Sequence, residues 1–362
     1  MVLSFRHLGF EFNSNVPLPM EEQVEGVDDD VDSADEALSE MLGLPSQSIN
    51  KIMHAVDEHH DIQEASDAIP SLSKERIESI FCSSQLARTY ASDSICILPN
   101  TLSVPAQLMR RLTDELVWGK RQADRTYESI RVMLAHGKIE DRRALTRLEN
   151  FVDDHEEWSD LCRGYIATCV ATLLGEEMVL YKEKLNLKPP GGAGFAPHLD
   201  TPSLNVALGE DGPQTFVTVM VAIDTMTAKN GCLRVVRGAW TRENHCEVVE
   251  PEKGGNPDAG GRAGALVSSD SLDFEDIVCK AGDIVVFDGW MPHRSSANNS
   301  AFPRRAVFLT YNPKKEGDFH KTYYQRMENI RNEWRVRVGL GIGALSADEQ
   351  QDLDALKTIP TI

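Results

Sequence analysis

A His-x-Asp pair, His198 and Asp200, closes a glycine-rich stretch near the middle of this chain. On an extended strand, residues i and i+2 point to the same face, so this imidazole and this carboxylate can bind one metal ion. His293, which follows the strand-like segment AGDIVVFDGW, is the candidate for a third ligand. Two histidines and one carboxylate hold one side of Fe(II) and leave the other positions for a cosubstrate and O2. The three residues predict a catalytic non-haem iron site.

The order of the surrounding segments strengthens this prediction. A His-x-Asp pair alone is weak evidence, because 10 histidines and 57 acidic residues make such pairs common by chance. Along this chain, however, a basic strand and a glycine-rich bend precede the pair. An apolar strand, an Asn-Gly-Cys turn, a Gly-Asp-apolar strand, a histidine and an arginine follow it. Together these segments favour a metal site over a chance pairing.

This order of segments resembles the phytanoyl-CoA dioxygenase family of Fe(II)- and 2-oxoglutarate-dependent oxygenases. The matching segments are His198–Asp200, Asn230–Gly238, Ala281–Phe287, Pro292–Ser295 and Arg304, within roughly residues 90–313. The resemblance implies that 2-oxoglutarate occupies two open positions of the iron and O2 the third. Succinate and CO2 are then released and an aliphatic substrate carbon is hydroxylated. The carboxylate of Asp200 favours hydroxylation, since halogenating relatives lack it.

The resemblance also places residues around 2-oxoglutarate. Arg304 falls at the position that binds its far carboxylate, for which a planar guanidinium with two donors is well suited. Ser295, two residues after His293, is expected to assist. Arg305 should face the opposite side of the strand, on the surface.

Three polar residues share one face of the strand before the bend: Lys182, Lys184 and Asn186. Inside a barrel such a row needs anionic partners, so Lys182 and Asn186 are expected to contact 2-oxoglutarate and Lys184, with Thr201, the substrate. The alternative is an edge strand whose lysines face solvent.

The substrate is less constrained than the chemistry. The stretch YKEKLNLKPPGGAGFAPHLD is similar to the branch of the family that hydroxylates small phosphonates such as 2-aminoethylphosphonate. A natural-product intermediate or an acyl-CoA are the alternative substrates. A non-catalytic metal- or ligand-binding protein with the same barrel is the alternative function.

Composition excludes several other classes of protein. The formal net charge of −20 argues against binding to nucleic acid or to an anionic membrane. The longest apolar run, Phe216 to Ile223, is too short for a transmembrane helix. Seven scattered cysteines without a Cys-x-x-Cys motif favour a reducing compartment, so we expect a soluble cytoplasmic protein.

Four regions follow from changes in pattern along the chain. Residues 1–43 are acidic and expected to be disordered, and residues 44–85 form a short helical extension that packs on the main domain or binds a protein partner. Residues 86–340 form the catalytic domain, and 341–362 a tail. The histidines at 59 and 60 are expected to be exposed helix residues.

Many short strands separated by Gly, Pro and Asn turns predict a mainly β fold with flanking helices. The resemblance implies that this fold is the double-stranded β-helix, a cupin-like jelly roll. Helices are expected over 103–120 and 158–174 and after residue 316, and His320 on the last of these is not a ligand. Residues 90–99 are expected to form a strand. The glycine-rich segment 241–270 is expected to be a long loop, either a lid or a surface insertion.

Overall fold

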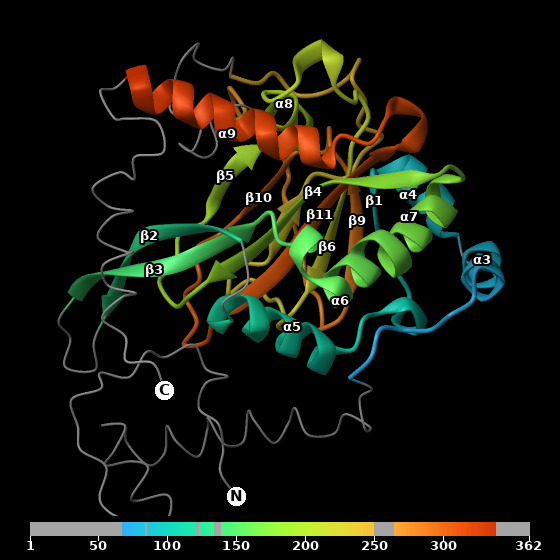
Figure 1. Ribbon diagram of the computed structural model, residues 1–362, viewed down its shortest axis with the longest axis horizontal. Coiled ribbons are helices and arrows are strands. Elements are labelled where there is room, and N and C mark those ends of the chain that lie inside the picture. Colours follow the sequence, from blue (N-terminus) through green and yellow to red (C-terminus); the bar gives the residue numbers. More distant parts are fainter. Residues whose placement is uncertain (1–66, 84, 120–122, 134–138, 250–263, 338–362) are drawn as a thin grey trace, which may run out of the picture.

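The computed structural model describes residues 67–83, 85–119, 123–133, 139–249 and 264–337. Within them the chain forms two antiparallel sheets with flanking helices, and this jelly roll confirms the predicted fold class (Figure 1). The larger sheet has, in spatial order, β1 (Ile95–Ile97), β9 (Ile284–Asp288), β6 (Val217–Ala222), β11 (Arg304–Pro313), β4 (Met178–Lys188), β3 (Ile139–Glu149) and β2 (Asp124–Met133). The smaller sheet has β5 (Phe195–His198), β10 (His293–Ser295), β7 (Leu233–Val235) and β8 (Glu275–Ile277).

Helices cover the outer face of the larger sheet, and one crosses its end (Figure 1). The helices on this face are α3 (Lys74–Ser83), α4 (Leu86–Asp93), α5 (Ala106–Trp118), α6 (Glu156–Ser159) and α7 (Ala167–Leu174), and α9 (His320–Arg337) crosses the end. The short α8 (Asp200–Leu204) directly follows β5. A π-helical stretch, Asp160–Ile166, joins α6 to α7, so the helix expected over 158–174 is confirmed. The helices expected over 103–120 and after residue 316 are confirmed by α5 and α9. None of the described helices is long and apolar enough to cross a membrane.

Strand β6 shows how the sheet separates two cores. Successive side chains of a strand point to opposite faces. Val219 and Val221 pack with the helices, while Met220 and Ala222 pack between the two sheets. All four side chains are fully buried. A strand that is apolar on both faces therefore lies in the middle of the layered structure.

One local expectation was wrong, and one element was missed. Residues 90–99 are not one strand, because α4 continues to Asp93 and Ser94 turns the chain with a left-handed φ of 55° before β1. The β2–β3 hairpin was not anticipated, since charged residues interrupt the apolar pattern of both strands. Through β3 this hairpin extends the sheet beyond β4, so β4 is not an edge strand.

The N-terminal extension is described only from residue 67. There, α3 buries Ile77 and Phe81 in the core between helices and sheet, so this part packs on the main domain. The tails at 1–43 and 341–362 lie outside the described residues, as do the histidines at 59 and 60.

Candidate metal centre

The predicted ligands come from three elements that meet at the mouth of the smaller sheet. His198 ends β5 and lies directly opposite His293 of β10. Asp200 is the first residue of α8, because the strand ends at His198 and only Leu199 between them is extended. The pair therefore does not share one strand face as expected, but the turn into α8 still brings the Asp200 carboxylate to the two imidazoles.

The three side chains are close enough to bind one ion. Asp200 Oδ1 lies 3.8 Å from His198 Nε2 and 3.6 Å from His293 Nε2. One ligand atom from each residue lies within 4.8 Å of the other two. Metal–ligand bonds of about 2 Å place neighbouring ligand atoms about 3 Å apart. The geometry therefore fits a metal ion with only small movements of the side chains.

Hydrogen bonds fix which atom of each side chain faces the ion. His198 Nδ1 lies 2.7 Å from the Ala196 carbonyl oxygen, and His293 Nδ1 lies 3.0 Å from that of Met291. A carbonyl can only accept, so each Nδ1 carries the proton and each Nε2 offers its lone pair.

The carboxylate is oriented in the same way. Thr218 Oγ1 of β6 donates to Asp200 Oδ2 at 2.7 Å, which leaves Oδ1 for the metal. All three groups thus present a free lone pair toward one point.

Their protonation states also suit a metal. Burial, together with the neighbouring His293, lowers the pKa of His198 to about 3, so its ring is neutral. Burial alone would raise the pKa of Asp200, but His293, Lys184, His198 and the Thr218 hydrogen bond together hold it below its usual value. Neutral imidazole and ionised carboxylate are the forms that bind metal ions.

Gly264 fixes the position of Leu199, the residue between the ligands His198 and Asp200. Its carbonyl accepts from the Leu199 amide at 2.9 Å. Its φ of +84° is a left-handed conformation, and an added Cβ would lie 2.3 Å from the Leu199 carbonyl oxygen. A side chain at 264 would therefore displace Leu199 and, with it, His198 and Asp200. Within the expected 241–270 loop, Ala265 and Leu266 pair with β5 beside the ligands.

The cavity that contains the ligands also contains a buried cation. It is lined by the three ligands and by Lys184, Asn186, Phe195, Leu233, Arg294, Ser295, Arg304 and Phe308. Arg304, at the start of β11, is 2% exposed. It donates to the Gly231 carbonyl, yet its Nε has no hydrogen-bond partner among the described residues. A buried donor without a partner fits an anionic ligand in this cavity.

Of the other predicted site residues, Ser295, Lys184 and Asn186 line this cavity, whereas Lys182 and Thr201 do not. Lys182 Nζ lies 2.8 Å from Glu149 Oε1. The side chain of Thr201 is fully buried, and its amide donates to the Gly289 carbonyl.

Two residues that contact this site were missed in the sequence. Lys188 follows Lys182, Lys184 and Asn186 at the same two-residue spacing, so the pattern that selected those three could have found it. Thr218 carries no local signal, because only the sheet brings β6 to Asp200.

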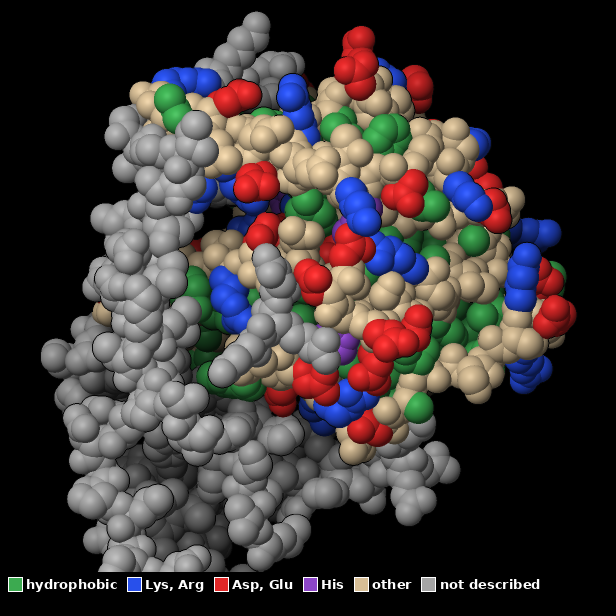
Figure 2. Space-filling model, viewed as in Figure 1, with side chains coloured by type: hydrophobic (Ala, Val, Ile, Leu, Met, Phe, Trp, Pro, Cys, Tyr) green, Lys and Arg blue, Asp and Glu red, His purple; other side chains and the backbone are tan. Residues whose placement is uncertain are grey.

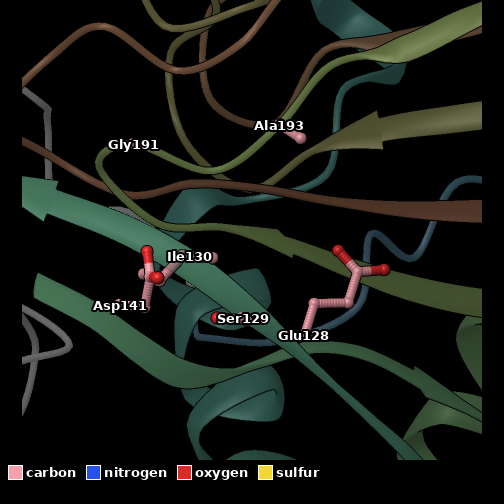
Figure 3. A pocket seen from close by; sticks show the side chains of 6 residues that line it. All are labelled: Glu128, Ser129, Ile130, Asp141, Gly191 and Ala193. Atoms are coloured by element: carbon pink, nitrogen blue, oxygen red, sulfur yellow. The ribbon is translucent and has the colours of Figure 1, made fainter.

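A larger and more open hollow of about 430 Å³ lies elsewhere, between the β2–β3 hairpin and the bend after β4. Figure 3 shows the side chains of Glu128 and Asp141 apart on the two strands, with Gly191 and Ala193 on the bend. No histidine or cysteine lines this hollow. On the described surface visible in Figure 2, acidic and basic side chains are interspersed, without a large basic field.

The chain is similar to several known proteins. The model of the phytanoyl-CoA dioxygenase family matches residues 45–306. A 2-aminoethylphosphonate dioxygenase of an uncultured bacterium is 38% identical over 184 residues, 51% of this chain and 64% of that protein. A methylphosphonate hydroxylase of Gimesia maris is 36% identical over 165 residues, 45% of this chain and 56% of that protein.

The matched segments thus span less than two thirds of the length of either relative. Among solved structures, EctD from S. alaskensis in its apoform aligns with a TM-score of 0.46 and 20% identity, over 64% of this chain and 78% of that one.

Proposed function

Because the chain belongs to the phytanoyl-CoA dioxygenase family, we propose that it is an Fe(II)- and 2-oxoglutarate-dependent oxygenase that hydroxylates an aliphatic carbon of a small polar metabolite. The observation that carries this proposal is the convergence of His198 Nε2, Asp200 Oδ1 and His293 Nε2 in a cavity that also contains Arg304. When bound, iron and 2-oxoglutarate supply the oxidation, with 2-oxoglutarate and O2 converted to succinate and CO2 as one oxygen atom enters the substrate.

The chain's own residues would bind and orient the iron and 2-oxoglutarate. His198, Asp200 and His293 would hold the iron, with their free lone pairs directed by the hydrogen bonds described above. Arg304 and Ser295 would bind the far carboxylate of 2-oxoglutarate through charge-assisted hydrogen bonds. Phe195, Leu233 and Phe308 line the same cavity and would keep water from the reacting carbon.

For the substrate we propose a small phosphonate. The two relatives reported above are named for 2-aminoethylphosphonate and methylphosphonate. In this chain Lys184 reaches the cavity, and its Nζ lies 5.4 Å from the centre of the Phe308 ring. No hydrogen-bond acceptor for Nζ is found among the described residues, and burial lowers the pKa of Lys184. Asp200 attracts this ammonium through charge alone, and a phosphonate group would supply an anion that accepts a hydrogen bond from it.

Succinate formation tests the proposal. Protein loaded anaerobically with Fe(II) receives 2-oxoglutarate and air, with 2-aminoethylphosphonate, methylphosphonate or their carboxylate counterparts, β-alanine and acetate. We expect Fe(II)-dependent succinate that a phosphonate stimulates and its carboxylate counterpart does not. Stimulation by another class of molecule would redirect the substrate assignment. Bound iron without succinate under any condition would favour the non-catalytic alternative.

Lys184 can be tested separately. Lys184→Met removes the charge and should raise the phosphonate KM about tenfold or more, whereas Lys184→Arg should retain most of the affinity. Equal loss in both variants would show that the side chain acts through packing.

The cytoplasmic location also stays a proposal. It is supported by the free thiols of all seven cysteines, which suit a reducing compartment. Nothing in the described part of the chain supports a protein partner for the N-terminal extension.

A further inference from the structure

Lys188, the last residue of β4, is a buried cation that the proposed chemistry does not yet use. Its side chain is 3% exposed. Its Nζ donates to Ser295 Oγ at 2.8 Å and to the Ser296 carbonyl at 2.7 Å, with a longer contact of 3.4 Å to the Gly231 carbonyl. All three acceptors are uncharged, so none of the described carboxylates accepts a hydrogen bond from Lys188.

The contact with Ser295 fixes the direction of that hydroxyl. A serine hydroxyl has two lone pairs and one hydrogen. Ser295 Oγ accepts from Lys188 Nζ and, at 3.3 Å, from the Phe195 amide, so both lone pairs are used. Its hydrogen is therefore free to be donated, and no acceptor for it is found among the described residues. Because Ser295 lines the metal cavity, this hydroxyl is a donor available to a ligand there.

A second cation lies next to the first. Lys188 and Arg304 are directly opposite each other on β4 and β11, and both donate to the Gly231 carbonyl. Burial, together with the charge of Arg304, lowers the pKa of Lys188 to about 7. Two adjacent buried cations are unfavourable unless an anion lies against them.

The turn at Gly231 allows Lys188 and Arg304 to approach the same carbonyl oxygen. Gly231 has a φ of +75°, and an added Cβ would lie 2.2 Å from the Ser296 carbonyl oxygen and 3.1 Å from Lys188 Nζ. Only glycine lets this carbonyl approach both cations.

We propose that Lys188 is a positioning residue for the far carboxylate of 2-oxoglutarate, since it holds the Ser295 hydroxyl as a donor and places a second positive charge behind Arg304. This inference rests on the proposed function, because it assigns the cosubstrate that the cavity binds.

The test compares two keto acids that differ only at the far end. Equilibrium binding of 2-oxoglutarate and of 2-oxopentanoate, which lacks the far carboxylate, is measured anaerobically on Fe(II)-loaded protein. We expect Lys188→Met to weaken the binding of 2-oxoglutarate about tenfold or more, which is the effect of losing a charge-assisted hydrogen bond. Binding of 2-oxopentanoate should change less than about twofold.

Three further variants separate charge from structure. Lys188→Arg retains the charge and should recover most of the 2-oxoglutarate affinity. Lys188→Gln retains a hydrogen-bond donor without the charge. If Lys188→Met does not fold, the affinities of Lys188→Gln for the two keto acids are compared instead. Lys280→Met, at an exposed lysine, changes the net charge equally and should bind both keto acids like the unmodified protein.

The outcomes are distinct. Unmodified protein that binds iron but not 2-oxoglutarate would overturn the proposed function itself. Unmodified protein that binds 2-oxoglutarate, with Lys188 variants that lose both keto acids equally or lose neither, would overturn only the positioning role. Selective loss of 2-oxoglutarate supports it.

Discussion

The middle and the end of β4 carry buried polar clusters that differ in how their charges are compensated. In the middle, Glu183 is fully buried and accepts four hydrogen bonds. Oε1 accepts from the amides of Phe151 and Val152, and Oε2 from His320 Nε2 at 2.7 Å and from the Tyr324 hydroxyl. A buried carboxylate with this many donors joins β4, α9 and the turn after β3 into one unit.

At the end of β4, none of the described carboxylates accepts a hydrogen bond from the two buried cations. Lys188 and Arg304 lie side by side, and their hydrogen-bond acceptors are neutral. Arg305, the next residue along β11, is bound instead by the carboxylates of Asp224 and Asp114. The difference teaches that burial of charge alone does not mark a site in this molecule. In the proposed function, the charges that bind a ligand are those without a carboxylate bonded to them.

The largest effect is expected at the metal-binding end, from Asp200→Ala. Without this carboxylate only two imidazoles remain, so Fe(II)-dependent succinate formation should fall below detection. The free energy of unfolding should change by no more than about 2 kcal/mol, because the main loss is the partner of the Thr218 hydroxyl. Succinate assays and urea unfolding measure both quantities. Retained turnover would contradict the assignment of the iron ligands.

The opposite pattern is expected from Glu183→Gln. An amide NH₂ cannot accept from His320 and Tyr324, so the buried network is broken and unfolding should become easier by about 3 kcal/mol or more. The 2-oxoglutarate KM of the folded fraction should stay unchanged. Glu316→Gln is the matched control, because among the described residues the half-buried Glu316 accepts from the Gln214 and Thr215 amides alone. This change should lower the free energy of unfolding by about 1 kcal/mol. If both variants lost the same free energy of unfolding, the Glu183 network would be no more important for stability than the contacts of Glu316.

Two neighbouring arginines sharpen the comparison further. Arg304→Met should raise the 2-oxoglutarate KM about 10- to 100-fold while leaving stability unchanged or higher, because it removes an uncompensated buried charge. Arg305→Met should leave that KM unchanged and lower stability, since Asp224 loses its partner. Steady-state kinetics and thermal unfolding of the two variants provide the measurements. A shared KM effect would mean that Arg305 also contacts the cosubstrate.

The sequence predicted much of this site because its signals are local. His198, Asp200 and His293 each sit beside a glycine-rich or apolar strand pattern whose order along the chain could be recognised. The turn into α8 was missed, since a two-residue spacing is compatible with a strand as well as with a strand end followed by a helix. The convergence itself does not depend on that difference.

Contacts across the sheet could not be predicted. The two-residue spacing of Lys182, Lys184, Asn186 and Lys188 shows that they share a face, but it does not show which acceptors lie there. Glu149 of β3 compensates Lys182, and that strand belongs to a hairpin whose charged residues hid it. Lys188 instead meets Ser295, more than a hundred residues away. Charge compensation is thus a property of the assembled sheet.

The smallest predicted effect is a pH dependence of 2-oxoglutarate affinity that Lys188 sets. Its pKa of about 7 is below the usual lysine value because burial and Arg304 disfavour the charged form. The charges of the other groups that face Lys188 do not change between pH 6 and 8. Arg304, with a pKa of about 10, remains charged, and the Cys232 thiol remains neutral because burial raises its pKa. Above pH 7 Lys188 must gain a proton before it can attract a carboxylate, so affinity falls as pH rises.

The loss of affinity between pH 6 and 8 should be about tenfold, because the charged fraction of Lys188 falls by that factor. Anaerobic binding of 2-oxoglutarate to Fe(II)-loaded protein at several pH values measures it. In Lys188→Arg the guanidinium stays protonated throughout, so the slope that belongs to Lys188 should vanish while the affinity at pH 6 is kept. The same slope in both proteins would place the titrating group elsewhere. A difference between them would show that Lys188, at the uncompensated end of β4, gains a proton when 2-oxoglutarate binds.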